Sequence, residues 1–160
     1  KRRGGTENVP GIAGYKKAVE LAMASMEERE KKERDLRDYL IDRIIAEVPY
    51  VRLNGHRSQR LSNNANFAFQ FIEGESLLIM LDGNGICGSS GSACTSGSLD
   101  PSHVLLAIGL PHEIAHGSLR LTVSPENTRE EMDFVVDRIK EIVQRLRDMS
   151  PLYEDFIRRK

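Results

Sequence analysis

The residue of this sequence best suited to covalent chemistry is Cys94. It lies within residues 88–100, a run rich in glycine and serine that predicts a mobile loop. A reactive cysteine needs solvent access and a means of forming the thiolate, whereas structural cysteines are usually buried among apolar side chains. A loop position also lets a nucleophile collect a group at one place and deliver it at another. The setting of Cys94 therefore favours a nucleophile or carrier, although no neighbouring residue identifies the base that would deprotonate it.

The second cysteine, Cys87, follows Ile86 in what the sequence predicts as a short strand. There it is expected to be a small buried hydrophobic residue. Two cysteines without a second ligand cluster argue against a disulfide framework and a closed zinc site. A redox pair of Cys87 and Cys94 stays open as an alternative.

Arg120 and Thr6 could each bind an anion. Arg120 interrupts the alternating apolar residues of a predicted strand, so its planar guanidinium could pair with a structural acid or hold a substrate carboxylate, and both alternatives remain open. Thr6 stands between glycines and a predicted helix, where its hydroxyl could bind a phosphate or cap the helix.

His112 and His116 lie one helical turn apart, but the sequence offers no third metal ligand. They are therefore expected to be surface or core histidines and not a metal site.

The elements that must position these residues follow from the periodicity of apolar side chains. Phe67, Phe69 and Phe71 alternate with smaller residues and are expected in the core. Thr128 and Glu131 form a capping box before the last long helix. A short helix is also expected after Pro111. The predicted helices cover residues 15–26, 27–48, 76–81, 102–108 and 132–149, and the predicted strands cover residues 51–53, 65–72 and 119–123.

The composition of the chain limits its partners. Its 160 residues suit one α/β core. The formal net charge of −1 supplies no one-signed field for nucleic acid or an anionic membrane. No apolar run approaches the roughly 20 residues of a membrane helix, and we expect a cytoplasmic protein without a nucleic-acid or membrane partner.

The segment from Ser89 to Leu110, reading SSGSACTSGSLDPSHVLLAIGL, closely resembles the active-site loop of the NifS/IscS-type cysteine desulfurases. The segments GGTENVPGIAG, FIEGESLLIMLD, AHGSLRLTVS and RLRDMSPLYEDF resemble the same family in the same order. The form SSGSAC resembles the group that feeds iron–sulfur cluster assembly.

The resemblance implies a homodimeric enzyme of the class V aminotransferase family, with fold type I and pyridoxal 5′-phosphate as cofactor. Cys94 would take sulfur from L-cysteine as a persulfide, leave L-alanine, and pass the sulfur to an iron–sulfur scaffold protein. Arg120 would bind the substrate carboxylate, and Thr6 would reach the cofactor phosphate of the other subunit. No resident metal is expected, although Cys94 could ligate an iron–sulfur cluster during transfer.

The resemblance also implies an α/β or α+β fold, the small C-terminal domain of such an enzyme with a few-stranded sheet packed with helices and a long linking helix before it. Residues 1–26 would be the end of the large domain and the linking helix, and residues 27–160 the small domain carrying the 88–100 loop. The lysine that anchors the cofactor should lie upstream of Lys1, so the chain is expected to be an inactive fragment of the enzyme. Two alternatives remain, a stand-alone sulfur-carrier or scaffold-docking module and a non-enzymatic iron–sulfur protein.

Overall fold

The alternating apolar residues of the predicted strands form one antiparallel sheet in the computed structural model, which describes residues 4–90 and 101–160. Strands β1 (Val51–Leu53), β2 (Asn64–Phe69) and β3 (Ser118–Thr122) lie in the order β1-β2-β3. Leu53 pairs with Phe67, and Phe67 pairs with Leu119 on its other side. The pleat places these three side chains on one face, so the apolar residues set the register.

Every predicted helix is present, although the helix ends differ from those predicted. The capping box of Thr128 and Glu131 is confirmed, as is the short helix after Pro111. The last helix, which begins at Pro151, was not predicted. The helices are α1 (Val9–Ala24), α2 (Met26–Glu47), α3 (Gly74–Asp82), α4 (His103–Ala107), α5 (His112–His116), α6 (Arg129–Asp148) and α7 (Pro151–Arg158).

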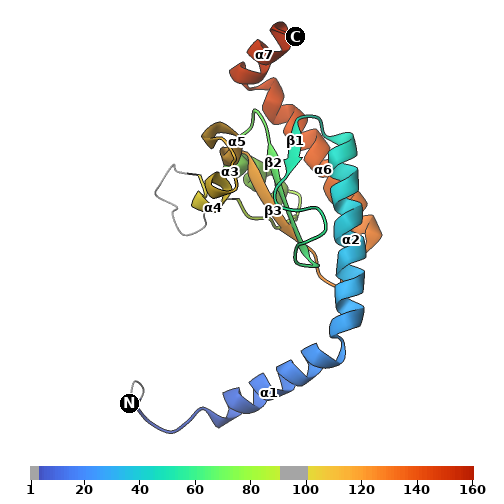
Figure 1. Cartoon of the computed structure of the whole chain (residues 1–160), viewed down its shortest axis with the longest axis vertical. Helices are drawn as coiled ribbons and strands as arrows, with labels where there is room; N and C mark the ends of the chain where they lie inside the picture. The colour runs from blue at the N-terminus through green and yellow to red at the C-terminus, as the bar shows by residue number, and fades with distance from the viewer. Residues whose placement is uncertain (1–3, 91–100) are drawn as a thin grey trace.

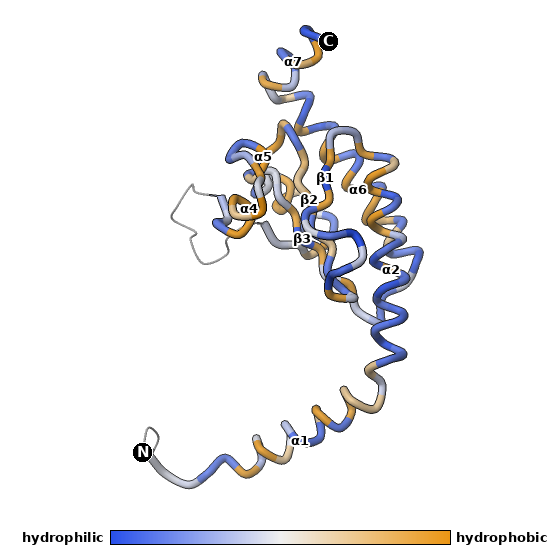
Figure 2. The backbone as a smooth tube through the Cα atoms, viewed as in Figure 1, coloured by the Kyte–Doolittle hydropathy of each residue, from blue (hydrophilic) through white to orange (hydrophobic). Residues whose placement is uncertain are grey.

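The core lies between one face of the sheet and three helices. Phe67, Phe69 and Leu119 are fully buried and share one apolar cluster with residues of α2, α3 and α6. In Figure 2 orange stretches of the tube alternate with blue or pale ones along the strands and recur from turn to turn in α2 and α6. Within residues 4–90 and 101–160, the opposite face of the sheet is covered at one end, where Ala68 packs with Leu105 and Ala115 of the α4–α5 region. Arg52, Arg120 and Thr122 on that face are exposed.

Helix α1 makes no contribution to this core. None of its residues is buried, and Figure 1 shows it extending away from the sheet and the other helices. Apolar side chains such as Tyr15, which is 75% exposed, lie along it. No helix in residues 4–90 and 101–160 has both the length and the apolar character that crossing a membrane requires.

Phe71 does not join the core, and here the prediction from alternation is wrong. Strand β2 ends at Phe69, and Phe71 has a φ of 68°, which turns the chain away from the sheet. Its ring instead packs against Phe156 of α7, with ring centroids 4.9 Å apart.

Arg147, only 1% exposed, donates hydrogen bonds to the carbonyls of Tyr50 and Gln70 and so connects this end of the sheet to α6.

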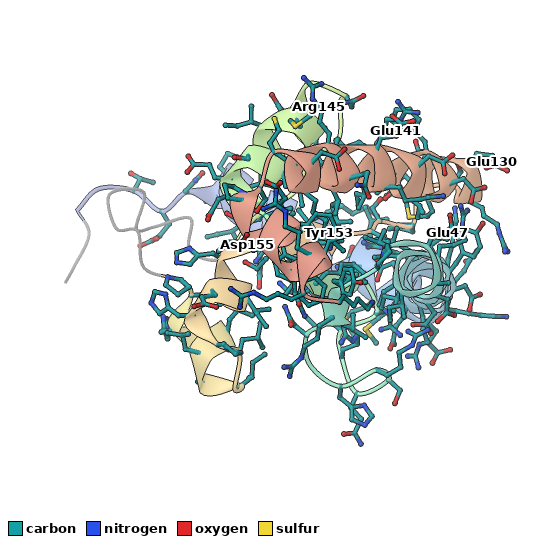
Figure 3. All side chains as sticks on the ribbon, turned by 90° about the horizontal axis from the view of Figure 1, so that it is seen from above. Glu47, Glu130, Glu141, Arg145, Tyr153 and Asp155 are labelled. Atoms are coloured by element: carbon teal, nitrogen blue, oxygen red, sulfur yellow. The ribbon has the colours of Figure 1, made fainter. Side chains whose placement is uncertain are left out.

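An ion-pair cluster joins α2 to α6 and should make stability depend on pH. Glu47 accepts hydrogen bonds from Arg43 on its own helix and from Lys140 Nζ of α6, the second at 2.6 Å. These hydrogen bonds, led by that from Arg43, lower the pKa of Glu47 from 4.5 to about 2. In Figure 3, Glu47 lies between α2 and α6, whereas Glu141 lies on the far side of α6.

We expect Glu47→Gln to lower the free energy of unfolding near neutral pH, where the Glu47 carboxylate is charged in both the folded and the unfolded chain. A carboxyl whose pKa is lower in the folded state stabilises above its unfolded pKa, and this contribution disappears as pH falls from 4.5 towards 2. Urea titrations of the parent protein and of Glu47→Gln between pH 7 and pH 2 measure the difference in their free energies of unfolding. Glu141→Gln is the control, because among the described residues Glu141 pairs with Arg138 on its own helix and with no residue of α2. A difference between Glu47→Gln and the parent protein that stays constant down to pH 2 would contradict the prediction.

Candidate active site

Arg120 lies in the middle of β3 on the face of the sheet opposite the core. Its neighbours Leu119 and Leu121 are buried at 0% and 5% exposure, so the pleat directs Arg120 to the other side, where it is exposed. Within residues 4–90 and 101–160, no side chain forms an ion pair with its guanidinium. The structural-acid alternative therefore has no support in the described part of the chain, and Arg120 is available to an anionic ligand.

Ser89 pairs with Arg120 on the free edge of β3. The Ser89 amide donates to the Arg120 carbonyl at 3.0 Å, and the Arg120 amide donates to the Ser89 carbonyl at 2.6 Å. The segment that contains Cys94 follows directly after Ser90, and Cys94 itself lies outside the described residues. After this segment the chain continues into α4, whose Leu105 packs against Ala68 on the same face of the sheet. Both described ends of the Cys94 segment therefore border the face that carries Arg120.

Two asparagines that the sequence interpretation missed complete this face. Asn66 of β2 is the direct strand partner of Arg120, and Asn54 hydrogen bonds to Asn66 from the end of β1. Asparagine is uncommon in strands, because it fits a pleated, half-buried surface poorly. An asparagine inside the predicted strand 65–72, and another directly after the predicted strand 51–53, were therefore the signals that could have identified them.

Thr6 lies in the segment before α1, and Figure 1 shows the start of α1 far from the sheet. It does not cap the helix. Asn8 is the N-cap, and its side-chain oxygen accepts a hydrogen bond from the Gly11 amide at 3.1 Å. The capping alternative is therefore wrong, and the structure does not bring Thr6 and Arg120 together within one chain.

Cys87 is exposed, so the expectation of a buried thiol is wrong. The predicted strand around Ile86 and Cys87 is also absent, since these residues follow α3 as irregular chain. Ile86, at 8% exposure, takes the buried position in this stretch. Cys87 borders a cavity of about 460 Å³ next to Met132 and Val135 of α6.

The remaining candidates contribute little to this face. His112 and His116 lie on α5 with ring centroids 5.2 Å apart, and the described residues hold no group of three potential metal-binding side chains around them or elsewhere. The lysines that make contacts do so on the surface. Lys16 pairs with Glu20, Lys140 with Glu47, and Lys160 with the Tyr50 hydroxyl.

Comparison with known families decides what kind of protein carries this face. The sequence model of the family described as aminotransferase class-V matches residues 1–135. The chain belongs to the class-V aminotransferase family. The matched range includes Thr6, Cys94 and Arg120.

Several curated relatives are close to this class-V aminotransferase chain over nearly its whole length. A protein named cysteine desulfurase IscS from Clostridium botulinum (strain Hall) is 55% identical over 161 aligned positions, which cover 99% of this chain and 41% of the relative. A protein of the same name from Methanosarcina thermophila is 57% identical, covering 95% of this chain and 37% of the relative. The chain thus spans about two fifths of the length of these relatives.

Solved structures share the fold of this class-V aminotransferase chain. A NifS-like protein superimposes with a TM-score of 0.75 at 32% identity, over 89% of this chain and 35% of the other. A NifS-like protein from Rickettsia africae superimposes with a TM-score of 0.76 at 30% identity, over 89% of this chain and 36% of the other. The expected α/β class, with helices packed on a small sheet, is confirmed.

Proposed function

We propose that the whole protein is a cysteine desulfurase that removes sulfur from L-cysteine for iron–sulfur cluster assembly. The observation that carries this proposal is the 55% identity, along 99% of the chain, to a relative named cysteine desulfurase IscS. The face around Arg120 supports it, because the guanidinium has no ion-pair partner within residues 4–90 and 101–160, and Arg120 pairs with Ser89 next to the start of the Cys94 segment.

In the proposed reaction Arg120 holds the substrate and Cys94 accepts the sulfur. The guanidinium binds the carboxylate of L-cysteine through its planar fork. The Cys94 thiolate attacks the substrate sulfur, so a sulfur–sulfur bond forms while the substrate carbon–sulfur bond breaks. The carbon takes a proton and leaves as L-alanine, and Cys94 keeps the sulfur as a persulfide. The products together contain every atom of the two thiols that reacted.

Pyridoxal 5′-phosphate, the cofactor that the family implies, supplies the electron sink that makes the carbon–sulfur bond labile. Thr6 fits a role at its phosphate, because Asn8 already caps α1 and the Thr6 side chain is exposed. In a homodimer this threonine would serve the cofactor of the other subunit. The anchoring lysine would come from outside these 160 residues, since none of the lysines in the chain lies in a matching motif.

The proposal extends to the organisation of the whole protein. Residues 1–26 would end the large domain and form the linking helix, and residues 27–160 would form the small domain. The absence of buried residues in α1 supports this division. The protein would be a cytoplasmic homodimer, and a scaffold protein would receive the sulfur from Cys94.

The test is to incubate the full-length protein with L-cysteine and to measure alanine together with the mass of the Cys94 peptide. Stoichiometric alanine and one added sulfur on Cys94 are expected. If Cys94 gained sulfur only when a separate desulfurase was added, and the protein itself produced no alanine, it would be a sulfur carrier and the proposed activity would be wrong.

A further inference from the structure

Four polar residues form a row across the sheet, one from each neighbouring segment. The backbone amide of Asn54 donates to the Asn66 carbonyl at 2.8 Å, Asn66 pairs with Arg120, and Arg120 pairs with Ser89. Residues directly opposite in an antiparallel sheet project on the same face, with Cβ atoms about 4.5–5.5 Å apart. The side chains of this row therefore stand next to one another on the open face, beside the end that α4 and α5 cover.

Hydrogen bonding within the row decides which atoms of Asn66 face a ligand. Asn54 Nδ2 donates to Asn66 Oδ1 at 2.6 Å, so the acceptor of the Asn66 amide points towards β1. The Nδ2 group of Asn66 then carries N–H donors that no acceptor of residues 4–90 and 101–160 takes up. The Ser89 hydroxyl donates to the Ser90 carbonyl at 3.3 Å and is engaged there. Next to the Arg120 guanidinium, this row of side chains therefore offers the N–H donors of Asn66 to a ligand.

The burial and the hydrogen bonds of Asn54 favour a role in positioning Asn66 as well as in folding. It is 5% exposed, and its carbonyl accepts a hydrogen bond from Arg60 Nη2 at 2.7 Å. Its side-chain Oδ1 is buried without a hydrogen-bond partner in the described part of the chain. A buried acceptor without a partner costs free energy, and such groups in native proteins call for a specific explanation. The need for Asn54 to orient the Asn66 amide would explain why this unpaired acceptor is kept.

We propose that Asn66 is a second carboxylate-binding residue beside Arg120, with Asn54 as the residue that orients it. A carboxylate accepts hydrogen bonds only, so it matches a face made of a guanidinium and an outward amide N–H group. This inference rests on the proposed function, which assigns the substrate carboxylate to Arg120. The Asn66 amide adds a neutral hydrogen-bond donor, which favours a group that only accepts hydrogen bonds, and it leaves the charge of the site unchanged.

The experiment compares ligands with and without a carboxylate on the full-length protein. Calorimetry gives the dissociation constants of L-alanine and of L-alaninamide, and steady-state kinetics give kcat and KM for L-cysteine. Asn66→Ala is expected to weaken L-alanine binding and to raise the KM for L-cysteine about tenfold, the effect of one lost hydrogen bond to a charged group, with kcat nearly unchanged. L-alaninamide binding should not change.

Asn66→Asp, which keeps the size of the side chain, should weaken L-alanine binding further because two carboxylates then face each other. Asn64→Ala is the matched control, since Asn64 lies on the same strand and face but pairs with Thr122. It should leave both dissociation constants unchanged.

Two outcomes would overturn the inference, and they separate it from the proposed function. If Asn66→Ala weakens L-alanine and L-alaninamide equally, or no more than Asn64→Ala does, while Arg120→Ala removes the preference for the carboxylate, then only the role of Asn66 is wrong. If Arg120→Ala also leaves the preference unchanged, then the carboxylate site itself is wrong, and the inference fails with it.

Discussion

Replacing Cys94 by alanine in the full-length protein is expected to abolish the production of alanine and sulfide from L-cysteine, with a fall in kcat of about a thousandfold or more. The physical reason is that the sulfur must leave the substrate as part of a new sulfur–sulfur bond, and alanine offers no atom to form it. Cys94→Ser should be equally inactive, since a hydroxyl cannot hold the sulfur as a persulfide. Substrate binding should survive, because Arg120 is unaltered.

The chain provides a matched control for Cys94. Cys87 is an exposed thiol close by in the sequence, and Cys87→Ala should keep the activity of the parent protein. Alanine formation and the mass of the two cysteine peptides are measured for each variant. Full activity in Cys94→Ala, or added sulfur on Cys87 in the parent protein, would refute the role given to Cys94.

Replacing Arg120 by alanine is expected to lower kcat/KM for L-cysteine about 100-fold, because removal of one partner from a close charge pair costs about 2–5 kcal/mol. The loss should appear chiefly as a raised KM, since the carboxylate is bound before and during the reaction. Arg120→Lys should recover only part of it, because an ammonium keeps the charge but not the two parallel hydrogen bonds of the guanidinium.

Arg52→Ala is the control for charge and exposure. Arg52 is an exposed arginine on the same face of the sheet, where it pairs with Ala68 on β2. Its removal should leave kcat/KM unchanged if Arg120 acts through direct contact with the substrate. Equal losses in the two variants would show that the face acts only through its general positive charge. An unchanged KM in Arg120→Ala would exclude Arg120 from the site.

Local patterns predicted the elements of this fold where the residues that define an element are neighbours in the sequence. The capping box of Thr128 and Glu131 is one example, because both of its hydrogen bonds are made within one turn. The alternation around Leu119 and Leu121 is another, since each strand residue chooses its face by the pleat. Phe71 shows the limit, because its contacts and those of its neighbour Gln70 are with α7 and Arg147, which come much later in the chain.

The surroundings of each cysteine also depended on packing that the sequence does not display. The sequence predicted a short strand around Ile86 and Cys87, with Cys87 as a small buried residue. In the folded chain Ile86 fills the buried position, and the next residue is left at the surface. Thr6 was an equally good N-cap by type, but the helix begins where Asn8 can accept the Gly11 amide.

The sequence by itself determined most of the helices and strands, the family resemblance, and the three residues proposed for the chemistry, Thr6, Cys94 and Arg120. It did so because a residue's type, its neighbours and the period of its apolar partners are all local properties. It missed α7 and predicted a strand at Ile86 and Cys87 that is absent.

Only the tertiary structure showed what surrounds Arg120. Ser89, Asn66 and Asn54 are far from Arg120 in the sequence or lie across other strands, and strand register brings them into one row. That register is set by the burial of Phe67 and Leu119 on the opposite face, so the packing of the core decides the composition of the proposed site.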